Sequence, residues 1–562
     1  MTTITLYGGV NEIGGCKILV EDGETRIFLD FGRAFGRYSD YFDGVFVRER
    51  TARGMLDVLS LGLIPPLEGL YRDDLIPDLG SPDFWARFRS RPDYRDLRRD
   101  RLAVDAILLS HAHLDHTGDL LFVRPEIPIL SSRMTAFIAK AMQDAGRPST
   151  SGVVYVNPKE KSKDKKADDS PQRENSLIIL KGISQQGHIQ RQWVFVDGEP
   201  EGEVHPSDPF ASPRSFWLWR PTKSDKKAPE MKPHGEAPKT PLRWWPLDHS
   251  VFGATGFALE TSAGWIAYTG DLRFHGHRSD DSQRFVEALQ ALRPRVLLCE
   301  GTHVDSPGQP VTEEEVHQNC LNAVRKAEGK LVIADFAPRN VERLLTFLDI
   351  ARQTGRRLLI QPKDAYLLTA MRLADPASVP NLKEEPFLAI YKDPKGREDK
   401  WEKVTREFYR SQLVGPDEVQ RSPGEYILAF SLWDMPDLLD IEYLMGEVPG
   451  GVYVYSNSKA YDEEQKVDLV RLWNWIRHFG LEPVGLQPVA QDSAGRVTAV
   501  DVTRGYHASG HASGPDLLRL VTEVRPEILI PIHTEHPAWW AERLKGTGIR
   551  VEIPDLAHPI PC

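Results

Sequence analysis

A dense set of histidines with one aspartate follows an apolar run in the first quarter of the chain. The segment SHAHLDH occupies residues 110–116, directly after AVDAILL, and a run of that kind is typical of a buried strand. In a loop at the end of a strand, His111 and His113 can hold one ion from one side. Asp115 and His116 can then hold a second ion from the other side. Neutral imidazole with carboxylate and water suits zinc with an open coordination position, as in catalytic sites, whereas a loop that only caps the next helix needs no such ligand density.

Three further residues complete a plausible ligand shell. His249 lies in LDHSVFGATGF, Asp271 in YTGDLRF and His533 in IPIHTEHP, and each follows an apolar run. A single polar residue at the end of a strand is usually an ordinary buried group, so none of the three would indicate a metal site alone. Together with the first cluster they predict a site for two ions, with Asp271 as the bridging carboxylate.

The elements that must position these residues indicate at least two domains. The 562 residues exceed the size at which one hydrophobic core keeps growing. The opening of the chain alternates β-rich runs with Gly-rich turns, as antiparallel hairpins do. From 305 to 490, apolar strands alternate with helical segments, which predicts βαβ units and a parallel sheet. Residues 491–562 return to short strands and loops.

Two stretches of the first part, 1–304, depart from this pattern. Residues 38–100 have Arg/Asp clusters around an apolar segment, a pattern that predicts a helical or irregular insertion. Residues 150–240 contain two charged runs, at 157–175 and 221–241, that have too few apolar residues to fold. We expect both runs to be mobile, solvated loops, and the alternative is that their lysines contact a nucleic-acid backbone.

Bulk properties exclude some classes of protein. A net charge of −11 argues against a protein that coats nucleic acid nonspecifically, although a basic channel can be local. The chain has no apolar stretch near the roughly 18 residues of a membrane span, and its N-terminus lacks the features of a secretion signal. The cysteines lack CxxC spacing, so they suit a reducing compartment and predict no zinc–thiolate site: Cys16, Cys299, Cys320 and Cys562. We expect a cytoplasmic protein that enters no membrane.

The ligand set HxHxDH, followed by a histidine, an aspartate and a last histidine, resembles the metallo-β-lactamase superfamily. The later motifs are similar to those of its β-CASP branch, which processes nucleic acids and includes ribonuclease J. The resemblance extends from GGVNEIGGCKILVEDG near the N-terminus to the final histidine, except for 38–100 and 150–240. It implies the α/β class, as a metallo-β-lactamase αβ/βα sandwich with an inserted β-CASP α/β domain. The sandwich would comprise 1–304 and 491–562, and the insertion 305–490.

The same resemblance assigns two residues outside the metal shell. Glu300 in LLCEGTH is similar to the acid of motif A, and His511 in HASGHAS to the histidine of motif C. The histidine of motif B has no counterpart, because ADFAPRNVERL places Asn340 or Glu342 there. The chain also ends soon after His533, so we expect no counterpart of the C-terminal domain of full-length ribonuclease J. Oligomeric state is left open.

The chemistry implied is phosphodiester hydrolysis by a hydroxide that two metal ions activate. Two ions about 3.5–4 Å apart can lower the pKa of water toward ~7 and clamp a phosphate. In this scheme one ion is bound by His111, His113 and His249. The other is bound by Asp115, His116 and His533. Asp271 and the hydroxide lie between the ions, Asp115 orients the hydroxide, and zinc is expected with manganese as the alternative.

A protonated leaving group completes the scheme. His511 is the expected proton donor, because imidazole titrates near neutrality and the charge of Glu300 favours the imidazolium form. The alternative is a hydrogen-bonded loop histidine. Small residues in the segment around it would let backbone N–H groups approach a phosphate, so we expect this segment to bind substrate: His507, Ala508, Ser509, Gly510 and His511.

The sequence therefore predicts a nuclease of single-stranded RNA, acting as a 5′-exonuclease, an endonuclease or both. In the β-CASP branch a motif C histidine goes with RNA enzymes, so His511 favours RNA. A DNA nuclease in repair or defence is the alternative. A small-molecule hydrolase would have no use for the block at 305–490, and a noncatalytic RNA-binding subunit would have lost metal ligands that this chain retains.

Overall fold

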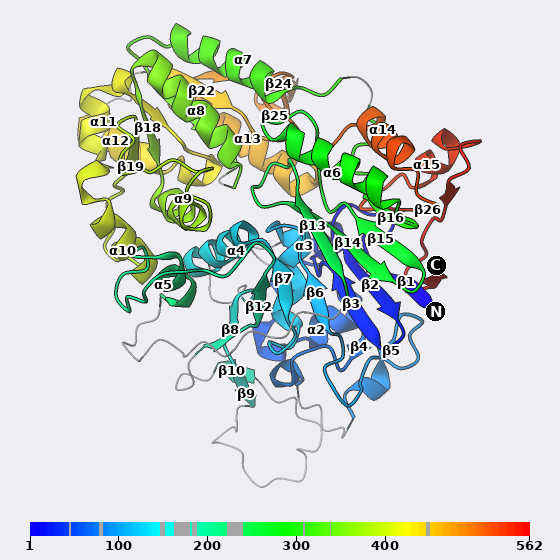
Figure 1. Cartoon of the computed structure of the whole chain (residues 1–562). Coiled ribbons are helices and arrows are strands. Elements are labelled where there is room, and N and C mark those ends of the chain that lie inside the picture. Colours follow the sequence, from blue (N-terminus) through cyan, green and yellow to red (C-terminus); the bar gives the residue numbers. More distant parts are fainter. Residues whose placement is uncertain are drawn as a thin grey trace.

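The computed structural model describes residues 1–43, 47–77, 83–146, 152–161, 180–182, 188–221, 240–306, 309–337, 339–445 and 450–562. In this part of the chain, the long strands form three sheets of six or seven strands (Figure 1). None of the helices in these residues is long and apolar enough to cross a membrane.

The first sheet combines antiparallel and parallel pairs. Its strands, in order across the sheet, are β12 (Trp193–Phe195), β7 (Ile129–Ser131), β6 (Ala106–Leu108), β3 (Thr25–Leu29), β2 (Lys17–Asp22), β1 (Thr2–Gly8) and β28 (Pro559–Pro561). β1, β2 and β3 form antiparallel pairs, whereas β6 runs parallel to β3 with Leu108 opposite Leu29. The carboxyl ends of β3 and β6 therefore meet at one edge, just before Asp30 and the segment 110–116.

The second sheet brings further strand ends to one edge. Its strands, in order, are β13 (Leu242–Pro246), β14 (Thr255–Thr261), β15 (Gly264–Tyr268), β16 (Val296–Glu300), β26 (Ile528–Ile532) and β27 (Arg550–Val551). The last four strands are parallel to one another. Asp271 follows β15, Glu300 ends β16 and His533 follows β26, so these three residues come together although they are far apart in the sequence.

Alternating apolar residues pack these two sheets face to face. Ile18 and Val20 of β2 point into the core that β15, β16 and β26 line from the other side, whereas Leu19 points outward. Helices cover the outer faces, with α4 (Arg133–Ala145) on the first sheet and α6 (Ser279–Leu292) and α14 (Gly514–Val524) on the second. The result is the αβ/βα sandwich that the sequence predicted.

The third sheet is entirely parallel. Its strands, in order, are β20 (Leu413–Val414), β19 (Leu388–Tyr391), β18 (Arg357–Ile360), β21 (Tyr426–Leu428), β17 (Leu331–Asp335), β22 (Gly451–Tyr455) and β23 (Glu482–Val484). The helices of this block are α7 (Glu313–Lys326), α8 (Val341–Thr354), α9 (Pro362–Ala374), α10 (Lys400–Phe408), α11 (Pro416–Arg421), α12 (Asp437–Met445) and α13 (Glu463–His478). Both faces are apolar, as a parallel sheet between helices requires, because Val332 packs on one side and Ile333 on the other.

The chain leaves this block later than the sequence pattern suggested. The expected boundary at 490 falls inside β24 (Leu486–Gln491), which pairs with β25 (Val497–Val502) as a hairpin. Leu486 and Val500 belong to the same apolar core as α13, so the hairpin packs with the α/β block. After it the chain returns to the sandwich, where β26 pairs with β16 and β28 with β1.

The stretches near 38–100 and 150–240 contain short helices and strands. They are α1 (Phe35–Ser39), α2 (Leu56–Ser60), β4 (Leu67–Glu68), β5 (Arg95–Asp96), β8 (Tyr155–Val156), β9 (Lys159–Lys161), β10 (Leu180–Gly182), β11 (Ile189–Gln190) and α5 (Pro213–Leu218). Residues 38–100 contribute Met55 and Leu59 to the core beneath the first sheet. Most of the charged runs at 157–175 and 221–241 lies outside the described residues, so the expectation of mobility there stays a prediction.

Ile530, at the centre of β26, is fully buried between the two sheets. Ile530→Ala should lower the free energy of unfolding by about 2–5 kcal/mol, because it removes packing and leaves a cavity. Val489→Ala is the control, since that side chain is 57% exposed and its loss should change stability by no more than about 0.5 kcal/mol. Denaturant titration followed by fluorescence measures both. Equal effects of the two substitutions on the free energy of unfolding would mean that β26 is not part of the sandwich core.

Candidate metal centre and active site

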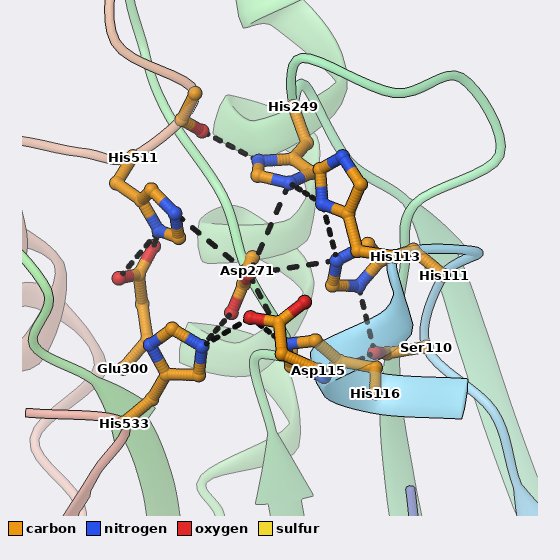
Figure 2. A network of polar contacts seen from close by, with 12 residues as sticks. Ser110, His111, His113, Asp115, His116, His249, Asp271, Glu300, His511 and His533 are labelled. Carbon is orange, nitrogen blue, oxygen red and sulfur yellow. Dashed lines mark hydrogen bonds and ion pairs between the residues drawn. The ribbon is translucent and has the colours of Figure 1, made fainter. Parts of the chain in front are cut away.

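All seven predicted metal ligands come together at the edge where strands of both sheets end (Figure 2). Their donor atoms form two groups, and within each group the atoms lie within 4.8 Å of one another. The first group is His111, His113, His249 and Asp271. The second group is Asp115, His116, Asp271 and His533. Asp271 belongs to both, which is the geometry expected of a bridging carboxylate.

In the first group three imidazole rings face one another. His113 Nδ1 lies 3.1 Å from His111 Nε2 and 3.2 Å from His249 Nε2. Asp271 Oδ2 lies 3.5 Å from His111 Nε2 and 3.9 Å from His249 Nε2. Burial lowers the pKa of His111 and His249 well below the ordinary value, so both rings are neutral. Neutral imidazole is the form that binds metal.

The second group is richer in negative charge. His533 Nε2 lies 3.2 Å from Asp115 Oδ2, and His116 Nε2 lies 3.2 Å from Asp271 Oδ2. Burial opposes the charged form of His116, but Asp271, Asp115 and Asp30 raise its pKa well above the ordinary value. This position therefore favours a positive charge, which a proton or a metal ion supplies.

Asp271 is the clearest test of whether a metal fits. The residue is 2% exposed, and neither of its oxygens accepts a hydrogen bond from any residue that the structure describes. Burial opposes its ionisation, but the charge of His116 holds the pKa of Asp271 well below its usual range. A buried carboxylate without hydrogen-bond donors is costly unless a cation compensates it. The donor set and this orphaned carboxylate fit a divalent metal ion.

The ring nitrogens that face away from the cluster are held by other groups. His249 Nδ1 donates to the carbonyl of Gly510 at 2.5 Å, and His533 Nδ1 lies 2.9 Å from Thr302 Oγ1. Such contacts fix the orientation and tautomer of metal-binding histidines. Neither Thr302 nor the Gly510 carbonyl was identified as a partner of these rings from the sequence.

Asp30 is the most important residue that the sequence analysis missed. It is fully buried, and its carboxylate accepts hydrogen bonds from His116 Nδ1 at 2.6 Å, Ser110 Oγ at 2.6 Å and the Tyr268 hydroxyl at 2.5 Å. The signal was present in FLDFG, where an aspartate ends an apolar strand, as Asp271 does. It was overlooked because its relevance depends on β3 lying beside β6.

Cys16 also lies closer to the site than its spacing suggested. Its sulfur, His116 and His533 form a group with ligand atoms within 4.8 Å of one another. Burial raises the pKa of the Cys16 thiol well above its ordinary value, so the thiolate that would bind metal is disfavoured. Cys16 therefore packs behind the cluster as a neutral thiol.

Close backbone packing fixes the position of Asp115. A Cβ atom at Gly32 would lie 1.6 Å from the carbonyl oxygen of Asp115, so only glycine fits there. Gly14, at φ +79°, approaches the Asp115 side chain in the same way. The Gly-rich opening of the chain thus supports the second ligand group.

Glu300 and His511 form a pair beside the two ligand groups. His511 Nδ1 lies 3.1 Å from both carboxylate oxygens of Glu300, and His511 Nε2 lies 3.9 Å from Asp271 Oδ2. Burial opposes the charged ring, but Glu300 and then Asp271 raise the pKa of His511 to about 9. The ring therefore carries a proton on the side that faces the metal ligands.

The segment 507–511 divides into two kinds of residue. His507, Ser509 and His511 line an open pocket of 360 Å³. Ala508 is fully buried, and a Cβ atom at Gly510 would lie 2.6 Å from Ser250 Oγ. The small residues thus allow close packing against the loop of His249, and the pocket-lining residues are the ones that can meet a substrate.

Two buried arginines hold this segment in place. Arg273 donates to the carbonyl of Ser509 at 3.0 Å, and Arg343 donates to the carbonyl of Tyr506 at 3.2 Å. Arg273 also pairs with three buried carboxylates: Asp248, Glu313 and Glu342. Its charge is therefore fully used within the protein.

The residues at motif B have structural contacts only. Asn340 caps α8, because its side chain accepts a hydrogen bond from the Arg343 amide at 3.1 Å. Glu342 pairs with Arg273 and accepts a hydrogen bond from the His277 amide. Neither residue belongs to the ligand groups, and Glu342 braces the loop of His511 through Arg273.

Two segments of the chain match known protein families. Residues 75–179 match the metallo-beta-lactamase superfamily, and residues 497–554 match the Zn-dependent metallo-hydrolase RNA specificity domain. The first match includes the segment 110–116, and the second includes His511 and His533. Metal use is thus supported by both the comparisons and the ligand geometry.

Ribonucleases J are among the similar proteins. Ribonuclease J of Mycobacterium tuberculosis (strain H37Rv) is 25% identical over 79% of this chain and 60% of its own length. Ribonuclease J of Corynebacterium glutamicum is 22% identical over 79% of this chain and 47% of its own length. The chain therefore spans about half to three-fifths of these relatives. A solved structure of a protein of unknown function from Enterococcus faecalis V583 has a TM-score of 0.62, with 19% identity over 100% of this chain and 99% of that one, which shows a shared fold.

Asp271→Asn should abolish stabilisation by metal, because it removes the charge common to both groups. Zinc at 100 times its dissociation constant should stabilise the wild-type protein by about 2.7 kcal/mol, and the variant by far less. Asp501→Asn is the matched control, because that aspartate is exposed on β25. Thermal unfolding with and without zinc measures the effect. Equal stabilisation of Asp271→Asn and the wild type would exclude Asp271 as a ligand.

Asp30→Asn should weaken metal binding without removing a ligand. Loss of a carboxylate that orients a metal-binding histidine typically costs about 10–100-fold in affinity. Competition with a chelator measures that affinity, and the melting curve of the metal-free variant controls for folding. An unchanged affinity in a folded variant would show that Asp30 supports only the strand edge.

Proposed function

We propose that this chain, a ribonuclease J-like member of the metallo-β-lactamase superfamily, is a metal-dependent nuclease that hydrolyses phosphodiester bonds in single-stranded RNA. The observation that carries the proposal is the pair of ligand groups that share Asp271, with the protonated His511 at 3.9 Å from the same carboxylate. A phosphodiester needs charge neutralisation and a proton for its leaving oxygen, and this arrangement offers both.

The two ligand groups would hold two divalent ions, for which we propose zinc because imidazole and carboxylate are its usual ligands. When bound, such ions lower the pKa of water and neutralise phosphate oxygens. His111, His113 and His249 would serve one position. Asp115, His116 and His533 would serve the other, with Asp271 common to both. Asp115, which is the more exposed carboxylate, would orient the attacking water.

His511 would donate the proton to the leaving 3′-oxygen. Its Nε2 faces the metal ligands, and its Nδ1 donates to Glu300 at 3.1 Å, so the ring is oriented with one N–H toward the reacting group. The Glu300 carboxylate is itself fixed by the amides of Leu272 at 3.1 Å and Thr302 at 3.2 Å. A held carboxylate keeps the imidazolium in place, so Glu300 would be a positioning residue and His511 the acid.

RNA is proposed as the substrate on two grounds. The match at 497–554 is to an RNA specificity domain, and several similar proteins are ribonucleases J. His511 at motif C also favours RNA over DNA. Action from a 5′ end, at internal bonds or both is consistent with a pocket beside His511 that is open to solvent.

The test uses end-labelled RNA and DNA of matched sequence, each with a 5′-phosphate, 5′-triphosphate or 5′-hydroxyl. Zinc-loaded and manganese-loaded protein should degrade RNA and leave DNA largely intact. The product ladder then distinguishes mononucleotide release from internal cleavage. Preferential cleavage of DNA, or no cleavage of either polymer, would contradict the proposal.

His511→Ala should lower kcat by about 10²–10⁴-fold while both metals stay bound, because general acid catalysis is typically worth that factor. A nitrophenyl phosphodiester has a good leaving group that needs no proton, so its hydrolysis should be largely unaffected. His478→Ala, exposed on α13, is the matched control. Metal content is measured alongside activity. Loss of metal together with activity would make His511 a ligand, and equal loss on both substrates would exclude the acid role.

A further inference from the structure

A polar pocket of 240 Å³ lies at the carboxyl edge of the third sheet, where β17, β21 and β22 end. It is lined by Asp335, the last residue of β17, and by Tyr455, the last residue of β22. The helix after β17, α8, packs on one face of the sheet, whereas α12 and α13, which follow β21 and β22, pack on the other. Neighbouring strands whose connections leave on opposite faces open a crevice at their carboxyl ends, where ligands of α/β proteins bind.

This sheet-edge pocket adjoins the pocket that contains His511. Asn457 and Lys459, in the loop after β22, line both pockets. A nucleic-acid strand that lies at His511 can therefore continue past these two side chains to the sheet edge. In the proposed reaction His511 protonates the leaving 3′-oxygen, which belongs to the nucleotide on the 5′ side of the cut. The sheet-edge pocket is thus on the 5′ side of the cut bond.

Asp335 is the buried carboxylate of the sheet-edge pocket. The residue is 2% exposed, and burial raises the pKa of its carboxyl to about 7. The Tyr453 hydroxyl donates to Oδ2 at 2.7 Å, and the Asn457 amide donates to Oδ1 at 3.5 Å. No lysine or arginine of the described residues forms an ion pair with it. Each carboxylate oxygen has two lone pairs, so each keeps an acceptor position for a ligand.

Other sides of the pocket suit a flat aromatic ring. Leu432 and Leu469 supply apolar surface, and Trp433 lines the pocket although it is 75% exposed. An exposed aromatic side chain offers a stacking platform to any nucleobase, because every base has a π-face. A phosphate would be repelled by the charge of Asp335, whereas a base has N–H groups to offer it. The pocket is smaller than the about 300–1,000 Å³ usual for drug-sized ligands, which suits a single base.

The acceptor pair of Asp335 discriminates among the bases. In single strands, bases stacked on aromatic side chains are read on their Watson–Crick edges. Guanine has two adjacent N–H donors on that edge, at N1 and N2. Adenine and cytosine each place one amino group beside an acceptor nitrogen, and uracil has one N–H between two carbonyls. A carboxylate, which offers two adjacent acceptors and no donor, therefore complements guanine.

We propose that the sheet-edge pocket binds a guanine base on the 5′ side of the cut bond, with its Watson–Crick edge on Asp335 and its ring against Trp433. This inference rests on the proposed nuclease function and adds a sequence preference to it. It gives the α/β block a direct part in choosing where the strand is cut. A free guanine nucleoside presents the same edge, so the experiments separate it from the RNA strand.

The first experiment changes the base. RNA oligonucleotides with a single guanine are cleaved by the metal-loaded protein and compared with the same oligonucleotides carrying inosine, which lacks the N2 amino group. Inosine should lower kcat/KM by about 10–100-fold, the usual range for a hydrogen bond to a charged group. 7-Deazaguanine is the matched control, because it keeps the Watson–Crick edge and should leave kcat/KM unchanged. The product ladder should place the guanine on the 5′ side of the cut.

The second experiment changes the protein. Asp335→Asn should cleave guanine and inosine substrates with nearly equal kcat/KM, because an amide no longer offers two acceptors. A purely structural role would lower kcat/KM on both substrates and keep their ratio. Trp433→Ala should lower kcat/KM on the guanine substrate by about 5–150-fold through lost stacking, and Trp433→Phe should recover part of the loss. Asp501→Asn and Tyr443→Ala are the matched controls, since both side chains are exposed in the α/β block outside the pocket.

The third experiment measures binding without turnover. Guanosine should bind the metal-loaded protein about 10–100-fold more tightly than inosine in titration calorimetry, and the difference should disappear in Asp335→Asn. Melting temperatures show whether each variant folds. If Asp335→Asn does not fold, the comparison of guanine with inosine and the effect of Trp433→Ala decide the question.

The outcomes separate this inference from the function on which it rests. An active wild type that treats guanine and inosine alike, in cleavage and in binding, would overturn the inference alone. A preference for guanosine without a preference for guanine in the cleaved strand would assign the pocket to a free nucleoside or nucleotide and overturn its assignment to RNA. A wild type that cleaves no nucleic acid would refute the proposed function, while the binding of guanosine would still test the pocket.

Discussion

The buried carboxylate of Asp271 is the group on which the rest of the site depends. The residue is 2% exposed, yet neither oxygen accepts a hydrogen bond from the described residues. Imidazole rings from four loops that are distant in the sequence face it instead: those of His111 and His116, His249, His511 and His533. Among them, the charge of His116 does most to lower the pKa of Asp271. The fold can bring them to one point because parallel strands of both sheets end at the same edge.

Around Asp271, a second set of contacts determines the orientation of the histidine rings. Asp30, Thr302 and the Gly510 carbonyl hold the outer nitrogens of three histidines, which leaves the inner nitrogens directed at the cluster. Arg273 ties the loop of His511 to the sandwich and, through Glu342, to the α/β block. The Glu342 carboxylate is therefore part of the scaffold, since its charge is matched by Arg273.

Among the described residues, the candidate metal ligands all come from the sandwich, which supplies the carboxylates and imidazoles that suit a cation. The sandwich and the α/β block are joined by continuous packing and by polar contacts: Phe216 of α5 lies 5.7 Å from the Tyr366 ring, and the Tyr366 hydroxyl donates to Asp144 at 2.7 Å.

The sequence by itself determined which side chains could bind metal, because ligand chemistry depends on residue type and the HxHxDH spacing is local. The alternation of strand and helix patterns predicted the parallel block, since such periodicities are local too, and the resemblance of the ligand motifs to the metallo-β-lactamase superfamily implied the αβ/βα sandwich. The role of Asp30 as a partner of His116 became evident only from the pairing of β3 with β6. The hairpin of β24 and β25 belongs to the α/β block because Leu486 and Val500 pack into its core, and such packing between distant residues cannot be seen in a local pattern.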